Sequence, residues 1–168
     1  MNREELRAAQ APLKERYRED PDSALVTLHA QGSLGDDRVS CSVSTGRALV
    51  EAGLHPATGG TGTLACSGDM LLEALAACAG VTLRAVATSM GLAVTGSVHA
   101  EGDLDFRGTL GVAKEENVPV GFQAIRLRFE LEHDESEQMI GRLIETTKRY
   151  CVVYQTLAGG LPIDVSFT

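Results

Sequence analysis

The sequence predicts one domain that combines antiparallel strands with two helices. At 168 residues the chain fits a single domain with a substantial core. Apolar and polar residues alternate along 38–45 and 122–132, which is typical of half-buried strands. Apolar residues recur every three or four positions along 69–90 and 135–150, which predicts two helices with buried faces.

The composition is that of an ordinary globular protein. Charged residues make up 23% of the chain and apolar residues 43%, which argues against disorder. The formal net charge of −8 argues against a nucleic-acid partner, because phosphate backbones attract basic surfaces. The N-terminus is charged and carries no secretory signal, and Glu73 and Arg84 interrupt the best candidate for a membrane span. We therefore expect a cytoplasmic protein without a membrane partner.

The N-terminal segment, residues 1–22, is polar and charged. Pro12 is expected to split it into two helical turns, because proline disrupts a helix interior. We interpret this segment as a surface arm, and we expect residues 23–168 to form the single domain.

Three strands are predicted before the first helix, over residues 24–30, 38–45 and 48–52. Cys41 falls on the apolar face of the second strand, and we interpret it as a core residue because free cysteine behaves as a small hydrophobe. A glycine-rich connector over 55–63 follows. It lacks the lysine of a phosphate-binding loop, so we interpret it as a linker.

The first helix is predicted over 69–90. Ser67 or Asp69 can cap its start, and Gly91 ends it. Its middle is rich in Ala and Leu with few charges, so we expect it to be covered on most sides. After this helix we expect a strand over 93–100, a solvated irregular segment over 103–121 and a strand over 122–132. A helix over 135–150 and a closing strand over 163–167 are expected to follow.

Two cysteines lie on the apolar faces of the two predicted helices. The apolar stripes hold Leu71, Leu75, Cys78 and Thr82 in the first helix, and Leu143, Thr147 and Cys151 in the second. Buried helix faces in a small domain commonly meet. The two thiols, 73 residues apart in sequence (151 minus 78), could therefore face each other across one helix contact. Such a pair can form a redox site.

We expect all the cysteines to be thiols, because a disulfide framework belongs to exported proteins. Structural zinc is the competing interpretation. The cysteines contain no closely spaced pair of the kind that binds zinc, since they stand at positions 41, 66, 78 and 151. The histidines follow no ligand pattern either. We expect no metal and no cofactor.

The two cysteine-containing segments, in this order along the chain, resemble the osmotically inducible protein C (OsmC) and organic hydroperoxide resistance (Ohr) family. Residues 70–82 resemble its L-L-x-A-L-x-x-C-x-x-x-T helix, and residues 150–157 resemble its C-P-V-x-x-T-L segment. The likeness extends from about Ala24 to the C-terminus. It implies an α+β fold, with antiparallel sheets packed on two long central helices, and an intertwined homodimer.

The resemblance also implies a thiol-dependent peroxidase that reduces organic hydroperoxides in oxidative-stress defence. Cys78 would attack the small-molecule hydroperoxide and become a sulfenic acid, and Cys151 would resolve it as a disulfide. A dithiol reductant, such as a lipoylated protein, would restore the thiols.

The Cys78 thiolate needs stabilisation, because burial raises a thiol pKa and the dipole of a helix fades beyond its first turn. The family uses an arginine held by a carboxylate. By position the resemblance implies Arg38 and Asp69, with three alternative arginines, Arg16, Arg18 and Arg47.

Two departures from the family pattern bear on this expectation: Val152 replaces the usual proline, and Cys66 is an additional thiol beside the first helix. Two other interpretations stay open. One is a protein of this fold without peroxidase activity that binds a small apolar ligand in the dimer groove. The other is a structural dimer whose cysteines are only core residues.

Overall fold

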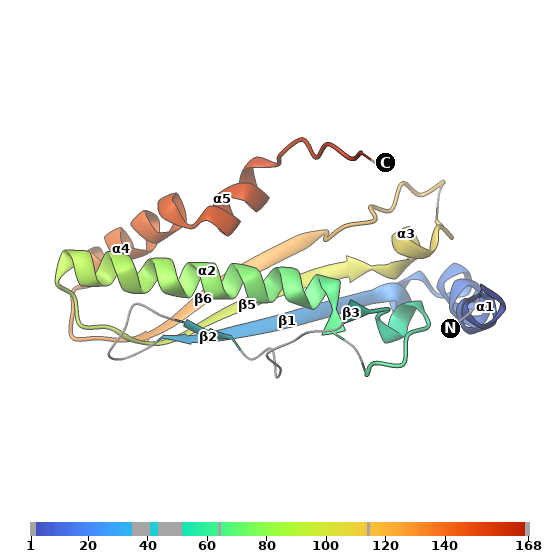
Figure 1. The fold of residues 1–168 in the computed structure, drawn as a ribbon, viewed down its shortest axis with the longest axis horizontal. Helices are drawn as coiled ribbons and strands as arrows, with labels where there is room; N and C mark the ends of the chain where they lie inside the picture. The colour runs from blue at the N-terminus through green and yellow to red at the C-terminus, as the bar shows by residue number, and fades with distance from the viewer. Residues whose placement is uncertain (1–2, 35–40, 44–51, 64, 114, 167–168) are drawn as a thin grey trace.

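The computed structural model describes residues 3–34, 41–43, 52–63, 65–113 and 115–166. Its main sheet is antiparallel, with strands in the order β2-β1-β5-β6, formed by Cys41–Val43, Leu25–Leu34, Thr95–Asp105 and Ala124–Glu132. Helix α2, Ser67–Met90, lies along one face of this sheet (Figure 1). The predicted α+β class with an antiparallel sheet on a long apolar helix is confirmed.

The two faces of the sheet differ in polarity. The apolar residues of β5 that pack against α2 are buried, namely Val98, Ala100 and Leu104. The apolar residues of β6 are half-buried and alternate with exposed, mostly charged ones; they are Ile125, Leu127, Phe129 and Leu131. On the outer face Arg126 pairs across the strands with Asp103 at 2.9 Å and with Glu101 at 3.3 Å. The alternation predicted over 122–132 is therefore confirmed.

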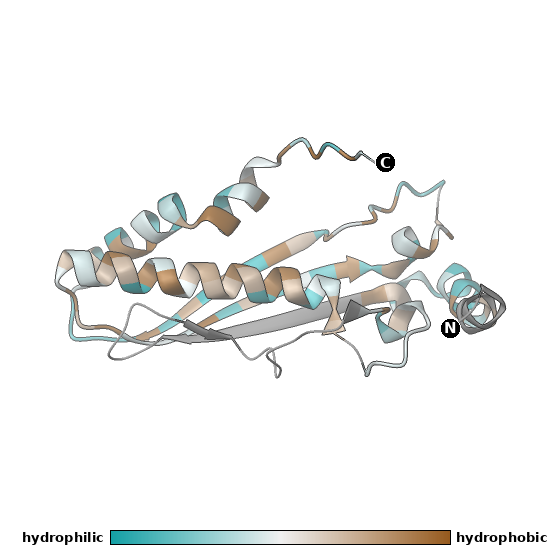
Figure 2. Ribbon diagram, viewed as in Figure 1, coloured by the Kyte–Doolittle hydropathy of each residue, from teal (hydrophilic) through white to brown (hydrophobic). Residues whose placement is uncertain are grey.

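Helix α2 provides the centre of the core. Its fully buried residues include Leu72, Leu75, Ala79 and Leu83, and it ends at Gly91, whose φ of 71° suits glycine. By length and apolar composition alone α2 could cross a membrane, contrary to the expectation from the sequence. In the structure α2 packs on β1, β5 and α4. Its apolar composition (Figure 2) is therefore also that of a core helix.

Two helices follow β6. Helix α4, Glu137–Tyr150, packs on α2 through Leu143, and Ser136 caps its start by accepting a hydrogen bond from the Met139 N–H. A second helix, α5 (Val152–Gly159), begins directly after Cys151. α5 is not among the helices predicted from the sequence.

The N-terminal segment is one helix, α1 (Arg3–Glu19), with Pro12 inside it, so the expected split at Pro12 is wrong. Proline removes one helical N–H, but tertiary contacts hold the helix. Tyr17 is fully buried and its hydroxyl donates to the Ala57 carbonyl at 2.7 Å. The partner lies in a short 3-10 helix, η2 (Pro56–Thr58), within the predicted linker.

The other short elements surround α1 and the start of α2. They are the 3-10 helix η1 (Pro21–Ala24), the parallel pair β3 (Ala52–Gly53) and β4 (Ala65–Cys66), and helix α3 (Phe106–Leu110). β5 extends to Asp105 and α3 follows it, so the segment expected to be irregular from 103 begins with regular structure. The side chain of Cys41, and residues 35–40 and 44–51 of the predicted strands, lie outside the described residues.

The closing strand predicted over 163–167 is absent from the described residues 160–166. Leu161, Ile163 and Val165 alternate as expected but are 65%, 85% and 90% exposed. An extended segment becomes a strand only when its backbone groups pair with a neighbour, and this segment extends away from the sheet (Figure 1).

Candidate active site

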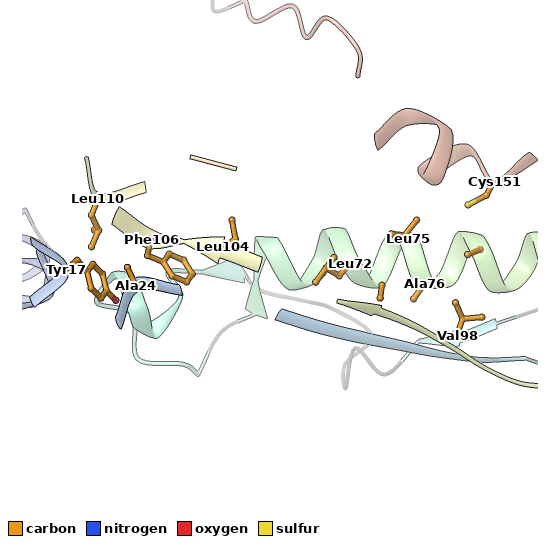
Figure 3. Packing of buried hydrophobic residues seen from close by; sticks show 12 residues of the cluster. Tyr17, Ala24, Leu72, Leu75, Ala76, Val98, Leu104, Phe106, Leu110 and Cys151 are labelled. Atoms are coloured by element: carbon orange, nitrogen blue, oxygen red, sulfur yellow. The ribbon is translucent and has the colours of Figure 1, made fainter. Parts of the chain in front are cut away.

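The chain path between α4 and α5 places Cys151 against Cys78. Cys151 is both the C-cap residue of α4 and the N-cap residue of α5, and it is 1% exposed. Cys78 is half-buried on α2 and packs against the same hydrophobic cluster. In Figure 3, Cys151 projects from the start of α5 toward α2. The structure therefore brings together the two thiols that the helix stripes indicated.

Cys78 packs against the hydrophobic cluster that contains Cys151, and a hydrogen bond from the Cys151 thiol is one of the causes that lower the pKa of Cys78. The Thr82 hydroxyl, one turn further along α2, is another of these causes. A sulfenic acid formed on Cys78 would therefore have a second thiol beside it, which is the requirement for forming a disulfide.

The N-terminus of α5 supplies further donors to the sulfurs. The first N–H groups of a helix have no partner within the helix. In α5 the backbone N–H groups of Val153 and Val152 are among the causes that lower the pKa of Cys78. The next N–H, from Tyr154, donates to Cys151 Sγ at 3.5 Å. Cys151 thus caps the helix that begins after it.

These contacts separate the pKa values of the two thiols. Burial acts to raise the pKa of Cys78, but the hydrogen bonds from Val153, Cys151, Thr82 and Val152 together outweigh it and lower the pKa below the ordinary value. Burial, reinforced by the hydrogen bond and charge of Cys78, raises the pKa of Cys151 to about 11. Cys78 therefore ionises first, which suits a nucleophile beside a protonated thiol.

Asp69 lies in the first turn of α2, nine residues before Cys78 (78 minus 69). That spacing corresponds to about 14 Å along the helix axis, so the structure does not bring the Asp69 carboxylate against the thiol. Burial lowers the pKa of His55 and raises that of Glu73, and the charge of Asp69 acts to raise the pKa of both groups. His55 stacks on Phe106 with ring centroids 4.7 Å apart.

Of the four candidates for the arginine expected at Cys78, Arg38 and Arg47 lie outside the described part of the chain. The other two candidates lie on α1, at the end of the molecule away from Cys151 (Figures 1 and 3). Arg16 lies 5.0 Å from the ring centroid of Tyr17, and Arg18 pairs with Glu15 at 2.8 Å. The donors to Cys78 within the described chain are backbone N–H, hydroxyl and thiol groups.

Cys66 is the N-cap residue of α2 and is half-buried. It precedes Cys78 by twelve residues (78 minus 66), about 18 Å along the helix. This separation makes Cys151, and not Cys66, the thiol that can reach Cys78 within one chain. Among the described residues, no three His, Cys, Asp or Glu side chains are grouped so that they could hold a metal ion.

A cavity of about 580 Å³ lies between β6 and the helices α4 and α5. Its apolar lining includes Leu75, Leu127, Phe129 and Leu157, and Tyr154 and Lys148 add polar atoms. Leu75 lies three residues before Cys78 on α2, and Tyr154 lies three residues after Cys151. The cavity therefore reaches to about one helical turn from each cysteine, and its lining includes neither of the two.

The helix α5 and the cavity lining after Cys151 were not predicted from the sequence. One signal for them is present in the sequence. Cys151 is a small residue whose side chain can accept a hydrogen bond, it precedes an apolar run, and Gly159-Gly160 ends that run, which together are compatible with a short capped helix.

The fold and the site define an α+β protein that holds two thiols in contact between an apolar helix and the start of another. The chain belongs to the OsmC-like protein family, whose model matches residues 60–166. A crystal structure of an OsmC-like hydroperoxide resistance protein from Jannaschia sp. CCS1 is similar, with a TM-score of 0.58 and 19% sequence identity. The likeness covers 83% of this chain and 91% of that one, and at this identity it establishes the fold. No curated protein matches the chain.

Proposed function

We propose that this protein is a cytoplasmic, cysteine-based peroxidase that reduces organic hydroperoxides in defence against oxidative stress. The observation that carries the proposal is the contact between Cys78 and Cys151, with ionisation favoured at Cys78. Membership of the OsmC-like family and the name of the similar Jannaschia protein support the choice of hydroperoxide as substrate.

The proposed reaction is a two-electron reduction. The Cys78 thiolate attacks the terminal oxygen of ROOH, an S–O bond forms, the O–O bond breaks, and the alkoxide takes a proton to leave as ROH. The Cys151 sulfur then attacks the Cys78 sulfenic sulfur. A disulfide forms, and the hydroxide leaves as water with the proton of the Cys151 thiol. A dithiol reductant, such as a lipoylated protein, restores both thiols and is itself oxidised to a disulfide.

Arg38 and Asp69 complete the proposed site in the roles that the family resemblance implies. Arg38 would place positive charge at Cys78, and Asp69 would hold the guanidinium from the start of α2. Because Asp69 lies about 14 Å along the helix from Cys78, it acts through the arginine and not on the sulfur. Arg38→Met and Asp69→Asn should each lower kcat/KM for a hydroperoxide, and Arg38→Lys should restore part of the loss.

The cavity lined by Leu75 and Tyr154, about one helical turn from each cysteine, supports an apolar substrate. Its walls from β6 and α5 are mainly aliphatic and aromatic, and burial of apolar surface is favourable by about 25 cal/mol per Å². A hydroperoxide with a hydrocarbon group would therefore bind better than hydrogen peroxide, which has none.

We propose that the active form is an intertwined homodimer. On α2 a second face, opposite the sheet, carries small and apolar residues at spacings of three and four: Leu71, Ala74, Cys78, Val81 and Ala85. Leu71 is 37% and Val81 38% exposed in the single chain. A second α2 packed on this face would cover both residues and close the surroundings of Cys78. The exposed, alternating apolar residues of 160–166 are compatible with pairing to another copy.

The dimer is tested by the mass of the protein in solution. Val81→Arg places a charge in the proposed contact and should yield a monomer by light scattering after size-exclusion chromatography. Arg142→Ala, at an exposed position of α4, is the matched control and should leave the mass unchanged. A wild-type protein with the mass of one chain would contradict the proposal.

The peroxidase is tested by adding one equivalent of cumene hydroperoxide to the reduced protein and mapping its disulfides by mass spectrometry. We expect a Cys78–Cys151 disulfide and one equivalent of cumyl alcohol. Cys78→Ser should abolish both, whereas Cys66→Ser should change neither. Free thiols at both positions after treatment would rule the proposal out.

A second candidate function rests on the same cavity. A volume of about 580 Å³ with apolar walls also suits a small apolar ligand that is bound without reaction. Peroxide consumption that is unchanged in Cys78→Ser would favour this alternative.

A further inference from the structure

The first step of the proposed reaction needs a proton whose source is not yet assigned. When the Cys78 thiolate takes the terminal oxygen of ROOH, the rest of the peroxide departs as an alkoxide. An alkoxide is a strong base and leaves slowly unless an acid protonates it. The proton of the Cys151 thiol is used in the second step, when the hydroxide leaves as water. A separate acid must therefore reach the alkoxide.

The cavity determines which side chains surround the alkoxide oxygen, because this oxygen is attached to the organic group R that the cavity would hold. The cavity lining is mostly aliphatic and aromatic. Among the described residues that line it, only Tyr154 and Lys148 carry a side-chain proton acidic enough to be transferred. The acid is therefore a phenol or an ammonium group.

Tyr154 is anchored beside the thiols. Its backbone N–H donates to Cys151 Sγ at 3.5 Å, so the residue begins next to this sulfur. Its side chain packs against the hydrophobic cluster that contains Cys151, as Cys78 also does. The same side chain lines the cavity. Tyr154 therefore connects the neighbourhood of the thiols with the space for the substrate.

Lys148 is better suited to assist the phenol than to replace it. Its ammonium pairs with Glu145 at 2.8 Å, and this hydrogen bond raises the pKa of Lys148, so the ammonium holds its proton more firmly. The Gln155 side-chain amide donates to the Lys148 carbonyl at 2.8 Å, which ties the end of α4 to α5. The charge of Lys148 interacts with Tyr154, and a positive charge stabilises the phenolate that remains after proton transfer.

We infer that the hydroxyl of Tyr154 is the catalytic acid that protonates the leaving alkoxide. The inference rests on the proposed function and adds the source of the proton to that reaction. The O–O bond breaks with its electron pair on the alkoxide oxygen, the O–H bond of Tyr154 breaks, and ROH forms. The phenolate then takes a proton from solvent, which restores the hydroxyl before the next turnover.

The test compares two oxidants that differ in their need for this proton. Cumene hydroperoxide releases an alkoxide, whereas perbenzoic acid releases benzoate, a weak base that leaves without being protonated. Reduced protein is mixed with each oxidant, quenched after set times and alkylated, and the oxidation of Cys78 is followed by mass spectrometry. Tyr154→Phe removes only the hydroxyl. Tyr150→Phe, at an exposed position one residue before Cys151, is the matched control.

We expect Tyr154→Phe to slow the oxidation of Cys78 by cumene hydroperoxide roughly 100-fold, a typical effect of losing a general acid, and to leave the rate with perbenzoic acid unchanged. Tyr150→Phe should leave both rates unchanged. Equal slowing with both oxidants would assign Tyr154 a structural role. A wild-type rate with cumene hydroperoxide in Tyr154→Phe would remove it from the reaction. Either of these two results would overturn the inference.

A measurement on the wild type decides the matter if circular dichroism shows that Tyr154→Phe does not fold. Proton transfer to the leaving group slows in heavy water, so oxidation of Cys78 by cumene hydroperoxide should be slower there at an equal thiolate fraction. Oxidation by perbenzoic acid should not be slower. Equal rates in the two solvents with cumene hydroperoxide would contradict the inference alone. A wild-type Cys78 that cumene hydroperoxide does not oxidise would reject the proposed function itself, and the inference with it.

Discussion

The backbone N–H of Tyr154 donates a hydrogen bond to Cys151 Sγ over 3.5 Å, so the thiol proposed to resolve the sulfenic acid also caps α5. Serine is a preferred residue at this position of a helix and alanine is not. Substitutions of Cys151 can therefore separate the role of its side chain in the helix from its role in the chemistry.

Cys151→Ala should destabilise the protein by about 1 kcal/mol through the lost cap, in addition to the loss of buried sulfur, whereas Cys151→Ser should retain the cap. Urea unfolding followed by circular dichroism measures this difference. Both variants should accumulate a Cys78 sulfenic acid after one equivalent of hydroperoxide, detected by dimedone labelling. A resolved disulfide in either variant would assign resolution to another thiol.

Because their pKa values differ, the two thiols are expected to be alkylated over different pH ranges. The pKa of Cys78 is lowered, so its thiolate persists to lower pH than that of an ordinary cysteine. Burial and the neighbouring Cys78 raise the pKa of Cys151 to about 11, so Cys151 should react only in strong alkali. Mass spectrometry of the two peptides over a pH series checks the order. Cys78→Ser should lower the pKa of Cys151, because it removes the Cys78 charge; alkylation of Cys151 before Cys78 in the wild type would contradict the assignment.

The cavity is expected to set the preference for apolar hydroperoxides. Leu157→Ala removes a half-buried side chain from its wall and should raise KM for cumene hydroperoxide roughly fivefold, which corresponds to about 1 kcal/mol of lost apolar contact. The rate with hydrogen peroxide should change little. Thr156→Ala, at an exposed position of the same helix, is the control. An equal change in KM for both peroxides would show that the cavity does not hold the substrate.

A buried ion pair is expected to stabilise the end of β5 without affecting the site. Asp105 is fully buried, caps α3 and accepts hydrogen bonds from the Arg107 guanidinium at 2.6 and 3.0 Å. Arg107→Met leaves this carboxylate without its partner and should cost roughly 3–5 kcal/mol in unfolding free energy. Arg128→Met, which breaks an exposed pair with Glu130, should cost at most about 1 kcal/mol.

The same pair predicts the direction of the acid response. Burial acts to raise the pKa of Asp105, but the hydrogen bonds and charge of Arg107 outweigh it and lower the pKa. Its contribution to stability is therefore present above the unfolded pKa and is lost as pH falls through the folded one. Wild-type stability in urea should fall over this acidic range, and Arg107→Met should show less of the fall. A variant with the wild-type acid profile would assign it to other carboxylates.

Much of the fold could be predicted because it depends on local patterns. The spacing of apolar residues indicated α2 and α4, and the alternation over 122–132 indicated β6 and its inner face. The failures have a common origin in tertiary contacts. Contacts of Tyr17 hold α1 together despite Pro12, and 163–166 alternates but pairs with no strand among the described residues.

The candidate site divides in the same way. The cysteine stripes of the two helices indicated that Cys78 and Cys151 could face each other, and the structure places both in one hydrophobic cluster. An arginine held by Asp69 was expected to stabilise Cys78. Arg38 lies outside the described residues, and the described donors that lower the Cys78 pKa are N–H, thiol and hydroxyl groups.

By itself the sequence predicted which faces of α2 and α4 are buried, and from them that Cys78 and Cys151 could face each other. This follows because the side-chain period of a helix is a local property. Only the tertiary structure decided how Cys78 is held. The chain leaves the helical conformation for one residue at Cys151, with φ −73° and ψ 106°, and resumes as α5. That single turn places the start of α5 against α2, where its backbone N–H groups are among the causes that lower the pKa of Cys78. No side-chain pattern in the sequence predicts this placement.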